Sequence, residues 1–515
     1  MNAHPHPHRA AATATTTTAA ATTAVAAAAQ QLRDSGELPE YVTQDAVVVV
    51  PGIMGSTLYD TTTGKDVWGI GGISWLLKAW TTPSGLKSLA MTEDELAGKT
   101  GRIKATGLLK HSAWTPYLAG SEPYTDLVET VRSSVADPAA VWEFAYDWRL
   151  PVAANGRLLA DAARRHLTEW RRHPAHARAR RHRADQREGR LVFVAHSMGG
   201  LVTRAALDPA HDSDLHTDTR GVITLGTPFQ GSVKAAVILG TGRGAPVPLP
   251  HRKLRSICAT MPGLHDLLPQ YRSLRAGGDV RHLTPSDIAA IGGSAELARD
   301  AARFHHGQRN ISLPDHRSVV GVNQPTWQNL TVTDGRVEAH YDGARSNSDG
   351  TLIRDRHDRL RYFRVHGDGT VYKESAVLTT AVTHLPLQHG DVAKARTALD
   401  AVTEILREDI HGGPPQGEAG CGLTAPDFVE AGQTWKIQLS DVDSLSGLTC
   451  RITDLDNPGP APQLALTWED GIATAKAAVP APGLYRIEVH TADGFGITQL
   501  VMAAEPGQPL AEAEA

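Results

Sequence analysis

The sequence predicts an α/β fold with a mostly parallel sheet, followed by a smaller all-β domain. Two continuous apolar runs, residues 46–50 and 191–194, have the composition of strands that are buried on both faces, as in parallel sheets. After about residue 421 the pattern changes to short alternating strands separated by turn residues, at the spacing typical of a sandwich. With 515 residues, 41% of them hydrophobic, the chain is long enough for a large α/β domain and a second domain.

The first core strand is predicted directly after Asp45, where four valines lead into a Pro51-Gly52 turn. Before this strand, residues 1–44 include an Ala/Thr-rich tract with no leucine-rich apolar region and no convincing cleavage site. We therefore expect a disordered tail rather than a signal peptide. No apolar run in the sequence approaches the length of a membrane-spanning helix.

The most informative motif is Ala195-His196-Ser197-Met198-Gly199. A sharp turn between a buried strand and a helix is how an α/β-hydrolase presents a nucleophilic serine to the base that takes its proton. The strict motif has glycine where Ala195 stands, so the turn must accommodate one extra methyl group. We predict an α/β-hydrolase fold with Ser197 as the nucleophile. Because this fold takes one oxyanion donor from the loop after an early strand and one from the residue after the nucleophile, we expect the N–H groups of Ile53 and Met198 to form the oxyanion hole.

Four short motifs occur in order along the chain, at residues 47–58, 144–149, 194–200 and 367–371. Together they resemble the lecithin:cholesterol acyltransferase family, over about residues 45–410. The resemblance implies a Ser–Asp–His triad on an α/β-hydrolase core. Such enzymes form an acyl-enzyme from a lipid ester and pass the acyl group to an alcohol or to water. The Ala-His-Ser-Met-Gly variant occurs within the family.

The acid of the triad should follow the serine in the chain and lie after a strand. Residues 360–366 alternate in the manner of a strand, and Gly367–Val371 turns out of it. We therefore assign the acid to Asp368, which would orient the imidazole and stabilise its charged form. Asp349 is the alternative, but it lacks the preceding glycine and the apolar strand, which is typical of a surface turn.

Two of the chain's 24 histidines, His384 and His389, lie directly ahead of the last helical pattern. Apolar residues recur at helical spacing between Val392 and Leu406. His389 stands beside the predicted helix start, with Asp391 as its N-cap, and the resemblance also implies a histidine shortly before the closing helix. We prefer His389 as the general base, with His384 as the alternative.

Three tryptophans, Trp68, Trp75 and Trp80, lie in an insertion after the first strand. The resemblance implies that this segment forms a lid and contacts lipid, and an indole suits such an interface because one end is apolar and the other donates a hydrogen bond. We expect these residues to be lid or lipid-contact candidates, with packing under the lid as an equal alternative.

Two charged motifs favour structural roles. Asp147-Trp148-Arg149 is more typical of an ion pair with a packed indole than of catalysis. The arginine-rich residues 164–190 have acidic residues among them, which favours a solvated helix end and loop over a site for anionic lipid headgroups.

The C-terminal part carries no catalytic constellation, and we expect it to stabilise the protein or bind a protein partner. The chain has three cysteines, Cys258, Cys421 and Cys450, which is no disulfide framework, although the last two could pair. The expected organisation is a tail at 1–44, an α/β-hydrolase domain at 45–410, a Gly/Pro-rich linker at 411–420, a β-sandwich domain at 421–505 and a tail at 506–515.

The sequence thus predicts a serine enzyme that acts on lipid esters, with phospholipid as the favoured substrate. A net charge of only −5 gives no case for nucleic-acid binding, and the triad requires no metal or cofactor. Without an export signal we expect a cytoplasmic protein, peripheral at membranes if it works at a lipid surface. A plain esterase or lipase that releases fatty acid to water is the close alternative. A catalytically silent binding or scaffold protein is the alternative of a different class.

Overall fold

The computed structural model describes most of the chain between residues 42 and 505. The described ranges are 42–69, 86–109, 124–183, 185–210, 213–245, 249–347, 349–408, 422–440, 442, 444–457, 461–490 and 496–505. Several predictions fall outside these ranges: the tails before residue 42 and after residue 505, the linker at 411–420, the tryptophans Trp75 and Trp80, and Cys421.

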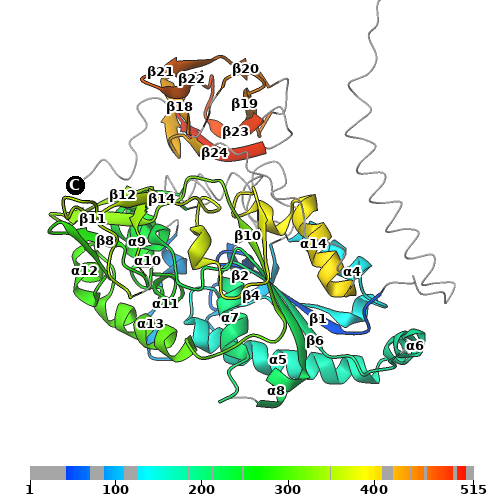
Figure 1. Ribbon diagram of the computed structural model, residues 1–515. Helices are drawn as coiled ribbons and strands as arrows, with labels where there is room; N and C mark the ends of the chain where they lie inside the picture. Colours follow the sequence, from blue (N-terminus) through cyan, green and yellow to red (C-terminus); the bar gives the residue numbers. More distant parts are fainter. Residues whose placement is uncertain are drawn as a thin grey trace, which may run out of the picture.

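A six-stranded parallel sheet forms the centre of the molecule, in the order β15-β10-β7-β6-β1-β5 (Figure 1). Its middle strands are apolar and almost fully buried, as strands covered on both faces must be. The strands are β1 (Ala46–Val50), β5 (Val141–Glu143), β6 (Leu191–His196), β7 (Thr219–Leu225), β10 (His316–Gly321) and β15 (Val382–Leu385).

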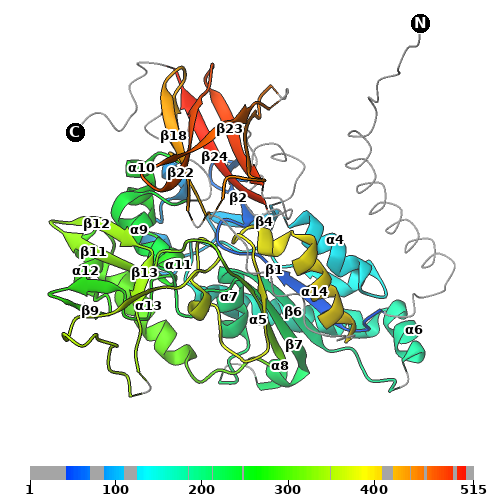
Figure 2. The same ribbon diagram turned by 45° about the horizontal axis from the view of Figure 1, so that its top comes forward.

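Helices cover both faces of this sheet (Figures 1 and 2). The long helix α5 (Val152–Arg172) packs against α7 (Met198–Ala206) on one face, and α4 (Thr125–Ser133) packs against α14 (Arg396–Arg407) on the other. The remaining α-helices are α3 (Glu93–Leu96), α6 (Pro174–His182), α8 (Ser213–Asp218), α9 (Val233–Thr241), α10 (His251–Cys258), α11 (Pro262–His265), α12 (Pro285–Ala290) and α13 (Ala295–Gln308).

Smaller elements surround the carboxyl edge of the central sheet. One antiparallel sheet consists of β2 (Ser56–Asp60), β3 (Lys65–Trp68) and β4 (Ile103–Leu108). A mixed sheet consists of β8 (Leu274–Ala276), β9 (Asp279–Arg281), β11 (Asn329–Thr333) and β12 (Arg336–His340). A two-stranded sheet consists of β13 (Asp342–Ala344) and β14 (Tyr362–Arg364). Short 3-10 turns are η1 (Lys87–Leu89), η3 (Pro138–Ala140), η4 (Lys373–Ser375) and η5 (Asp391–Ala393).

The C-terminal part is built from two sheets that share one apolar core and sit on the α/β part (Figures 1 and 2). Leu484, Leu500 and Met502 pack into the large core of the α/β part, so the two parts have a common apolar contact. The first sheet consists of β16 (Gly422–Thr424), β18 (Thr434–Ser440), β21 (Leu466–Glu469) and β22 (Ile472–Ala478), and the second of β17 (Phe428–Glu430), β19 (Thr449–Asp454), β20 (Gln463–Leu464), β23 (Gly483–His490) and β24 (Gly496–Ala504).

The predicted fold class, an α/β-hydrolase core with a C-terminal β-sandwich, is confirmed. The strand expected at 360–366 is confirmed in part: β14 covers only Tyr362–Arg364, and it pairs in a two-stranded ribbon. Two local predictions are wrong. The helix expected from Val392 begins at Arg396, because Asp391 starts the 3-10 turn η5 instead of capping an α-helix. His384 lies on β15 and not in a loop.

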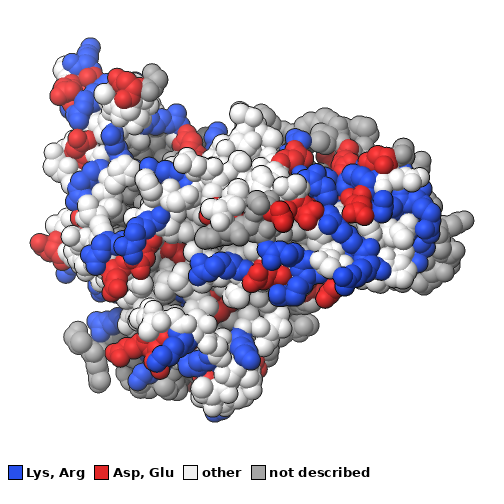
Figure 3. Space-filling view, turned by 90° about the horizontal axis from the view of Figure 1, so that it is seen from below, with Lys and Arg blue, Asp and Glu red and all other residues white. Residues whose placement is uncertain are grey.

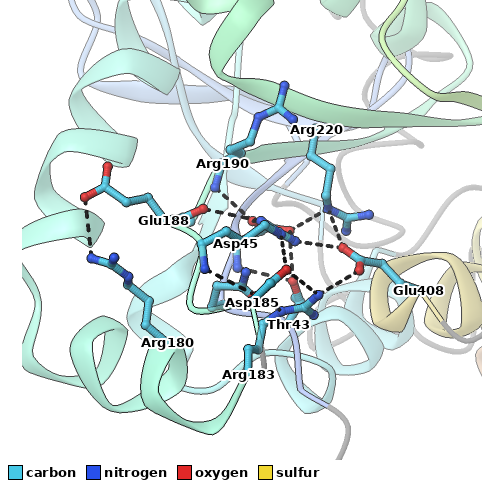
Figure 4. Close-up of polar contacts among 12 residues, drawn as sticks. Thr43, Asp45, Arg180, Arg183, Asp185, Glu188, Arg190, Arg220 and Glu408 are labelled. Carbon is cyan, nitrogen blue, oxygen red and sulfur yellow. Dashed lines mark hydrogen bonds and ion pairs between the residues drawn. The ribbon is translucent and has the colours of Figure 1, made fainter.

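The arginine-rich segment forms an ion cluster around Asp45, at the foot of β1. Figure 3 shows Lys and Arg side chains interspersed with Asp and Glu at the end of the molecule where Figure 1 places α6. Both carboxylate oxygens of Asp45 accept hydrogen bonds from Arg187 (2.7 and 3.0 Å), and Arg220 Nε lies 2.5 Å from one of them (Figure 4). Glu408 at the end of α14 also binds Arg187 (2.7 Å). The cluster therefore ties the first strand of the α/β part to its last helix.

Asp45→Asn should destabilise the protein by roughly 3 kcal/mol at pH 7, because it leaves arginine charges without their buried counter-charge. Burial raises the pKa of Asp45, but the hydrogen bond and charge of Arg187 and the charge of Arg220 outweigh it, so the net pKa is lowered. The stabilisation is therefore complete above the unfolded pKa of about 3.9 and is lost as the pH falls through the lowered folded value.

Thermal unfolding between pH 7 and pH 3 checks this prediction. The gap in Tm between wild type and Asp45→Asn should be constant from pH 7 to about pH 5 and then narrow. Asp185→Asn is the matched control: this exposed carboxylate pairs with Arg183, and its loss should change Tm little. Equal effects of the two variants would contradict the role given to Asp45.

Candidate active site

The turn that carries Ser197 joins the end of β6 to the start of α7. Ser197 has φ 51° and ψ −126°, a backbone conformation that residues other than glycine rarely adopt. Its N–H donates to the carbonyl of Leu225 at the end of β7 (2.9 Å). This bond fixes the strained turn at the carboxyl edge of the parallel sheet and presents the serine hydroxyl there.

Close packing between α7 and its neighbours explains the small residues after the serine. A Cβ on Gly199 would lie 2.5 Å from two backbone carbonyl oxygens at the end of β1, and one on Gly200 would lie 2.0 Å from Oγ1 of Thr227. A side chain at Gly199 would therefore require the backbone to move, and one at Gly200 would require Thr227 to move. Ala195 is fully buried within β6, and its methyl group is accommodated where the strict motif has glycine.

His389 joins Ser197 to Asp368 in one continuous chain of hydrogen bonds. Nε2 of His389 lies 2.8 Å from Oγ of Ser197, and Nδ1 lies 2.8 Å from Oδ2 of Asp368. The other carboxylate oxygen of Asp368 accepts the N–H groups of Thr370 (2.9 Å) and Val371 (2.7 Å). With Asp368 as an ionised acceptor, Nδ1 carries the imidazole hydrogen and Nε2 offers its lone pair to the serine O–H.

The alternatives for the acid and the base lie elsewhere. Asp349 is exposed, and its carboxylate accepts bonds from the N–H (2.9 Å) and hydroxyl (2.6 Å) of Thr351, which is the geometry of a surface turn. His384 pairs with Val320 within the central sheet. The structure thus brings Ser197, Asp368 and His389 together and leaves the other two residues outside the group.

The loop after β1 lies beside the serine, as the sequence predicted. Neither the N–H of Ile53 nor that of Met198 donates a hydrogen bond to any residue in the described ranges. Met198 is the first residue of α7, and the first N–H groups of a helix have no acceptor within the helix. Met54 has φ 65°, and its carbonyl accepts the indole N–H of Trp68 (2.8 Å). The hydrogen bond from Trp68 holds the loop in this left-handed conformation at Met54.

Sequence reasoning missed a second buried hydrogen-bond chain, which starts at Tyr124. The Tyr124 hydroxyl accepts the N–H of Gly52 (2.8 Å) and lies 2.9 Å from Nδ1 of His196. Nε2 of His196 lies 3.0 Å from the carbonyl of His389. Because a carbonyl only accepts, His196 carries its hydrogen on Nε2, and the Tyr124 O–H therefore donates to Nδ1. This chain couples the loop after β1 to the backbone of His389.

A narrow apolar cavity of about 120 Å³ opens on Ser197 and His389. Trp68 and Trp148, whose rings meet edge to face at 5.7 Å, line it together with aliphatic side chains, among them Leu86, Leu89, Ile238, Leu254, Ile257 and Leu264. Trp68 is buried, so it forms part of the cavity wall. A lipid-contact role for Trp68 stays a prediction.

The Asp147-Trp148-Arg149 motif supports this wall from behind. Arg149 is fully buried and binds both carboxylate oxygens of Asp147 (2.9 and 2.7 Å) and Glu95 (2.8 Å). The indole N–H of Trp148 donates to the carbonyl of Ser56 (3.3 Å). The predicted ion pair with a packed indole is confirmed.

The described residues contain neither a membrane-spanning helix nor a cluster of metal ligands. No helix there has the length and apolar character needed to cross a bilayer. In the same part of the chain, no group of three or more His, Cys, Asp or Glu side chains is placed to hold a metal ion.

The comparison with protein families confirms the resemblance seen in the motifs. Residues 100–289 match the model of the lecithin:cholesterol acyltransferase family, a segment that includes Ser197 but ends before Asp368 and His389. This similarity supports an enzyme of the general lipid-ester hydrolase or acyltransferase class. No curated protein matches the chain.

Solved structures with similar chains are remote in sequence. A chain of the Tle4–Tli4 complex is 15% identical, with a TM-score of 0.43, and the match covers 70% of this chain and 98% of that one. The Bacillus licheniformis lipase BlEst2 in its propeptide form is 12% identical, with a TM-score of 0.32, and covers 90% and 93%. The M1 domain of titin is 16% identical, with a TM-score of 0.13, and covers 16% and 95%.

Tyr124→Phe should lower kcat for a p-nitrophenyl ester by roughly 5- to 100-fold, with little change in KM. The substitution leaves the Gly52 N–H and Nδ1 of His196 buried without a partner, a loss of about 1–3 kcal/mol, and both groups lie next to the serine site. Steady-state kinetics of the purified variant measures the effect.

Tyr485→Phe is the matched control, since the hydroxyl of Tyr485 also donates a hydrogen bond, to the carbonyl of Ala481 (2.9 Å), but in the sandwich. Its Tm should fall like that of Tyr124→Phe, while its kcat stays at the wild-type value. If both variants keep wild-type kcat, the Tyr124 chain has no part in positioning the site.

Proposed function

We propose that this protein is a serine-dependent lipid acyl hydrolase and O-acyltransferase that acts on lipid esters, with phospholipid as the acyl donor. The observation that carries this proposal is the unbroken hydrogen-bond chain from Ser197 through His389 to Asp368 at the mouth of an apolar cavity. The family match over residues 100–289 supports the general class, and the cavity supports an apolar acyl chain as the part of the substrate that it holds.

The first half of the reaction makes an acyl-enzyme. Oγ of Ser197 attacks the acyl carbonyl carbon while Nε2 of His389 takes its proton, and Asp368 stabilises the imidazolium that results. The N–H groups of Ile53 and Met198 bind the oxyanion, a contribution that is typically the largest electrostatic one. When the carbon–oxygen bond to the leaving alcohol breaks, His389 returns the proton to that alcohol.

The second half reverses these steps with a new nucleophile. Water or an acceptor alcohol attacks the acyl carbon, His389 takes its proton, and the proton passes to Oγ of Ser197 as the acyl–serine bond breaks. Water gives a fatty acid and an alcohol gives a new ester. The balance between them depends on which molecule reaches the acyl-enzyme beside His389.

A fluorophosphonate probe should label the wild-type protein once per chain, at Ser197, because only an activated serine attacks phosphorus at a useful rate. Ser197→Ala should remain unlabelled, and Asp368→Asn should label more slowly by roughly 10⁴-fold, as expected when the imidazole tautomer is lost. Intact-protein mass spectrometry measures the stoichiometry. A wild-type protein that does not label would favour a silent binding or scaffold protein.

Phospholipid vesicles with and without a long-chain alcohol provide the product assay. Wild type should release fatty acid and, with the alcohol present, form its ester, while Ser197→Ala should lose roughly 10⁴- to 10⁶-fold in turnover. Fatty acid alone would make the protein a plain lipase or esterase. Turnover that survives in Ser197→Ala would refute the assignment of the nucleophile.

A further inference from the structure

His389 lies in the loop that joins β15 to the 3-10 turn η5. The α/β part binds the backbone of this residue at two points. Its N–H donates to the carbonyl of Asp368 (2.8 Å), and its carbonyl lies 3.0 Å from Nε2 of His196. The carbonyl of the preceding residue, Gln388, accepts the N–H of Asp391 (2.9 Å) in η5. These bonds use the backbone of the loop, and the side chain of Gln388 binds elsewhere.

The half-buried side chain of Gln388 binds the C-terminal sandwich. Its Oε1 accepts the backbone N–H of Thr498 on β24 (3.2 Å). Strand β17 pairs with β24 at residues 502–504, so Thr498 lies outside the stretch that β17 covers. A backbone donor of the sandwich is thus bonded to the residue directly before His389.

Strand β24 has a fixed place because it packs into two cores at once. One of its faces lies in the apolar core of the sandwich, with Ile497, Val501 and Ala503. The opposite face lies in the large core of the α/β part, with Leu500 and Met502. Figure 1 shows β24 on the side of the sandwich that faces the α/β part. The N–H of Thr498 is therefore held at a set position relative to the loop of His389.

A second polar contact between the two parts does not involve this loop. Nε2 of His251 on α10 lies 3.5 Å from Oδ2 of Asp427, directly before β17. Both contacts join the sandwich to the α/β part, but only the contact at Gln388 includes a neighbour of His389. The two can therefore be compared to separate docking of the sandwich from an effect on the imidazole.

The imidazole of His389 tolerates little displacement. Its two nitrogens bond in different directions, Nε2 to Oγ of Ser197 and Nδ1 to Oδ2 of Asp368, each at 2.8 Å. A shift of the loop therefore lengthens at least one of these bonds, and misplacing a catalytic group by about 1 Å can cost about 100-fold in rate. A restraint on the residue before His389 acts on the chemical step.

We infer that the C-terminal sandwich is a positioning element of the active site, which holds the loop of His389 through the bond from Thr498 to Gln388. This role rests on the proposed function. The family match ends at residue 289 and does not include the sandwich. Among the described residues, neither Gln388 nor Thr498 lines the apolar cavity, so both act through His389 and not on the acyl chain.

Gln388→Leu tests this role in the full-length protein, because leucine keeps a similar size and removes the acceptor. We expect kcat for p-nitrophenyl octanoate and the rate of labelling by a fluorophosphonate probe to fall together, by roughly 5- to 50-fold. KM should stay within about twofold, since the cavity is unchanged. Gln388→Glu keeps an oxygen acceptor at this position and should retain kcat to within about threefold of the wild type.

Asp427→Ala is the matched control, because it removes the contact with His251 and leaves Gln388 bonded. It should lower Tm about as much as Gln388→Leu does, while its kcat and its labelling rate stay at the wild-type values. A role of Gln388 in stability alone would instead lower Tm in both variants and kcat in neither.

Thr498→Pro removes the same bond from the side of the sandwich, because proline has no N–H and is tolerated where a strand is not covered by a neighbour. Its kcat should fall as in Gln388→Leu. The double variant should lose no more than the more impaired single variant, since both substitutions remove one shared interaction. If Gln388→Leu does not fold, Thr498→Pro compared with Asp427→Ala decides the question.

A wild-type protein that neither releases nitrophenol nor reacts with the probe refutes the proposed function. A wild type that does both, with the same kcat in Gln388→Leu, refutes the positioning role and leaves the proposed function in place. Equal losses of kcat in Gln388→Leu and Asp427→Ala also refute that role, because any loosening of the sandwich would then lower the activity. Independent, multiplying losses in the double variant would exclude the bond between Thr498 and Gln388 as the cause.

Discussion

The strained turn at Ser197 is the constraint on which the rest of the site depends. A residue with positive φ between a strand and a helix is stable only if the surrounding packing holds it. Here the end of β1 leaves no room for a Cβ on Gly199, Thr227 leaves none for a Cβ on Gly200, and the N–H of Ser197 is bonded to β7. Three neighbouring strands of the parallel sheet thus stabilise the strained backbone of one serine. The imidazole of His389 is positioned relative to that serine.

The hydrogen bonds around this point form two buried chains that converge on His389. One chain runs through the imidazole to Asp368 and sets the tautomer. The other runs from the loop after β1 through Tyr124 and His196 to the His389 backbone. Both ring and backbone of the histidine are therefore constrained, and the loop after β1 is constrained by the same network. A low-dielectric site makes such fully satisfied networks rigid.

The sequence predicts those features of the fold and the site that depend on residues next to one another in the chain. The strand, turn and small residues around Ser197 are contiguous, so the elbow and the parallel sheet could be predicted. The alternation before Asp368 predicts a strand, but only the short strand β14 forms there, and the pairing of Gly367 with Gln324 positions Asp368. Tyr124 gave no signal, because its partner lies 72 residues away. The docking of the sandwich on the α/β part through Leu484, Leu500 and Met502 depends on tertiary contacts, which no sequence periodicity indicates.

The distance along the chain between Ser197 and His389, 192 residues, has a consequence for biosynthesis. At about 5–20 residues per second, the ribosome adds His389 roughly 10–40 s after Ser197. Glu408, which completes the ion cluster around Asp45, and the sandwich are added later still. A nascent chain that ends before residue 389 therefore holds Ser197 without the imidazole that binds its hydroxyl in the folded protein, so the proposed activity cannot begin until the ribosome has passed that residue.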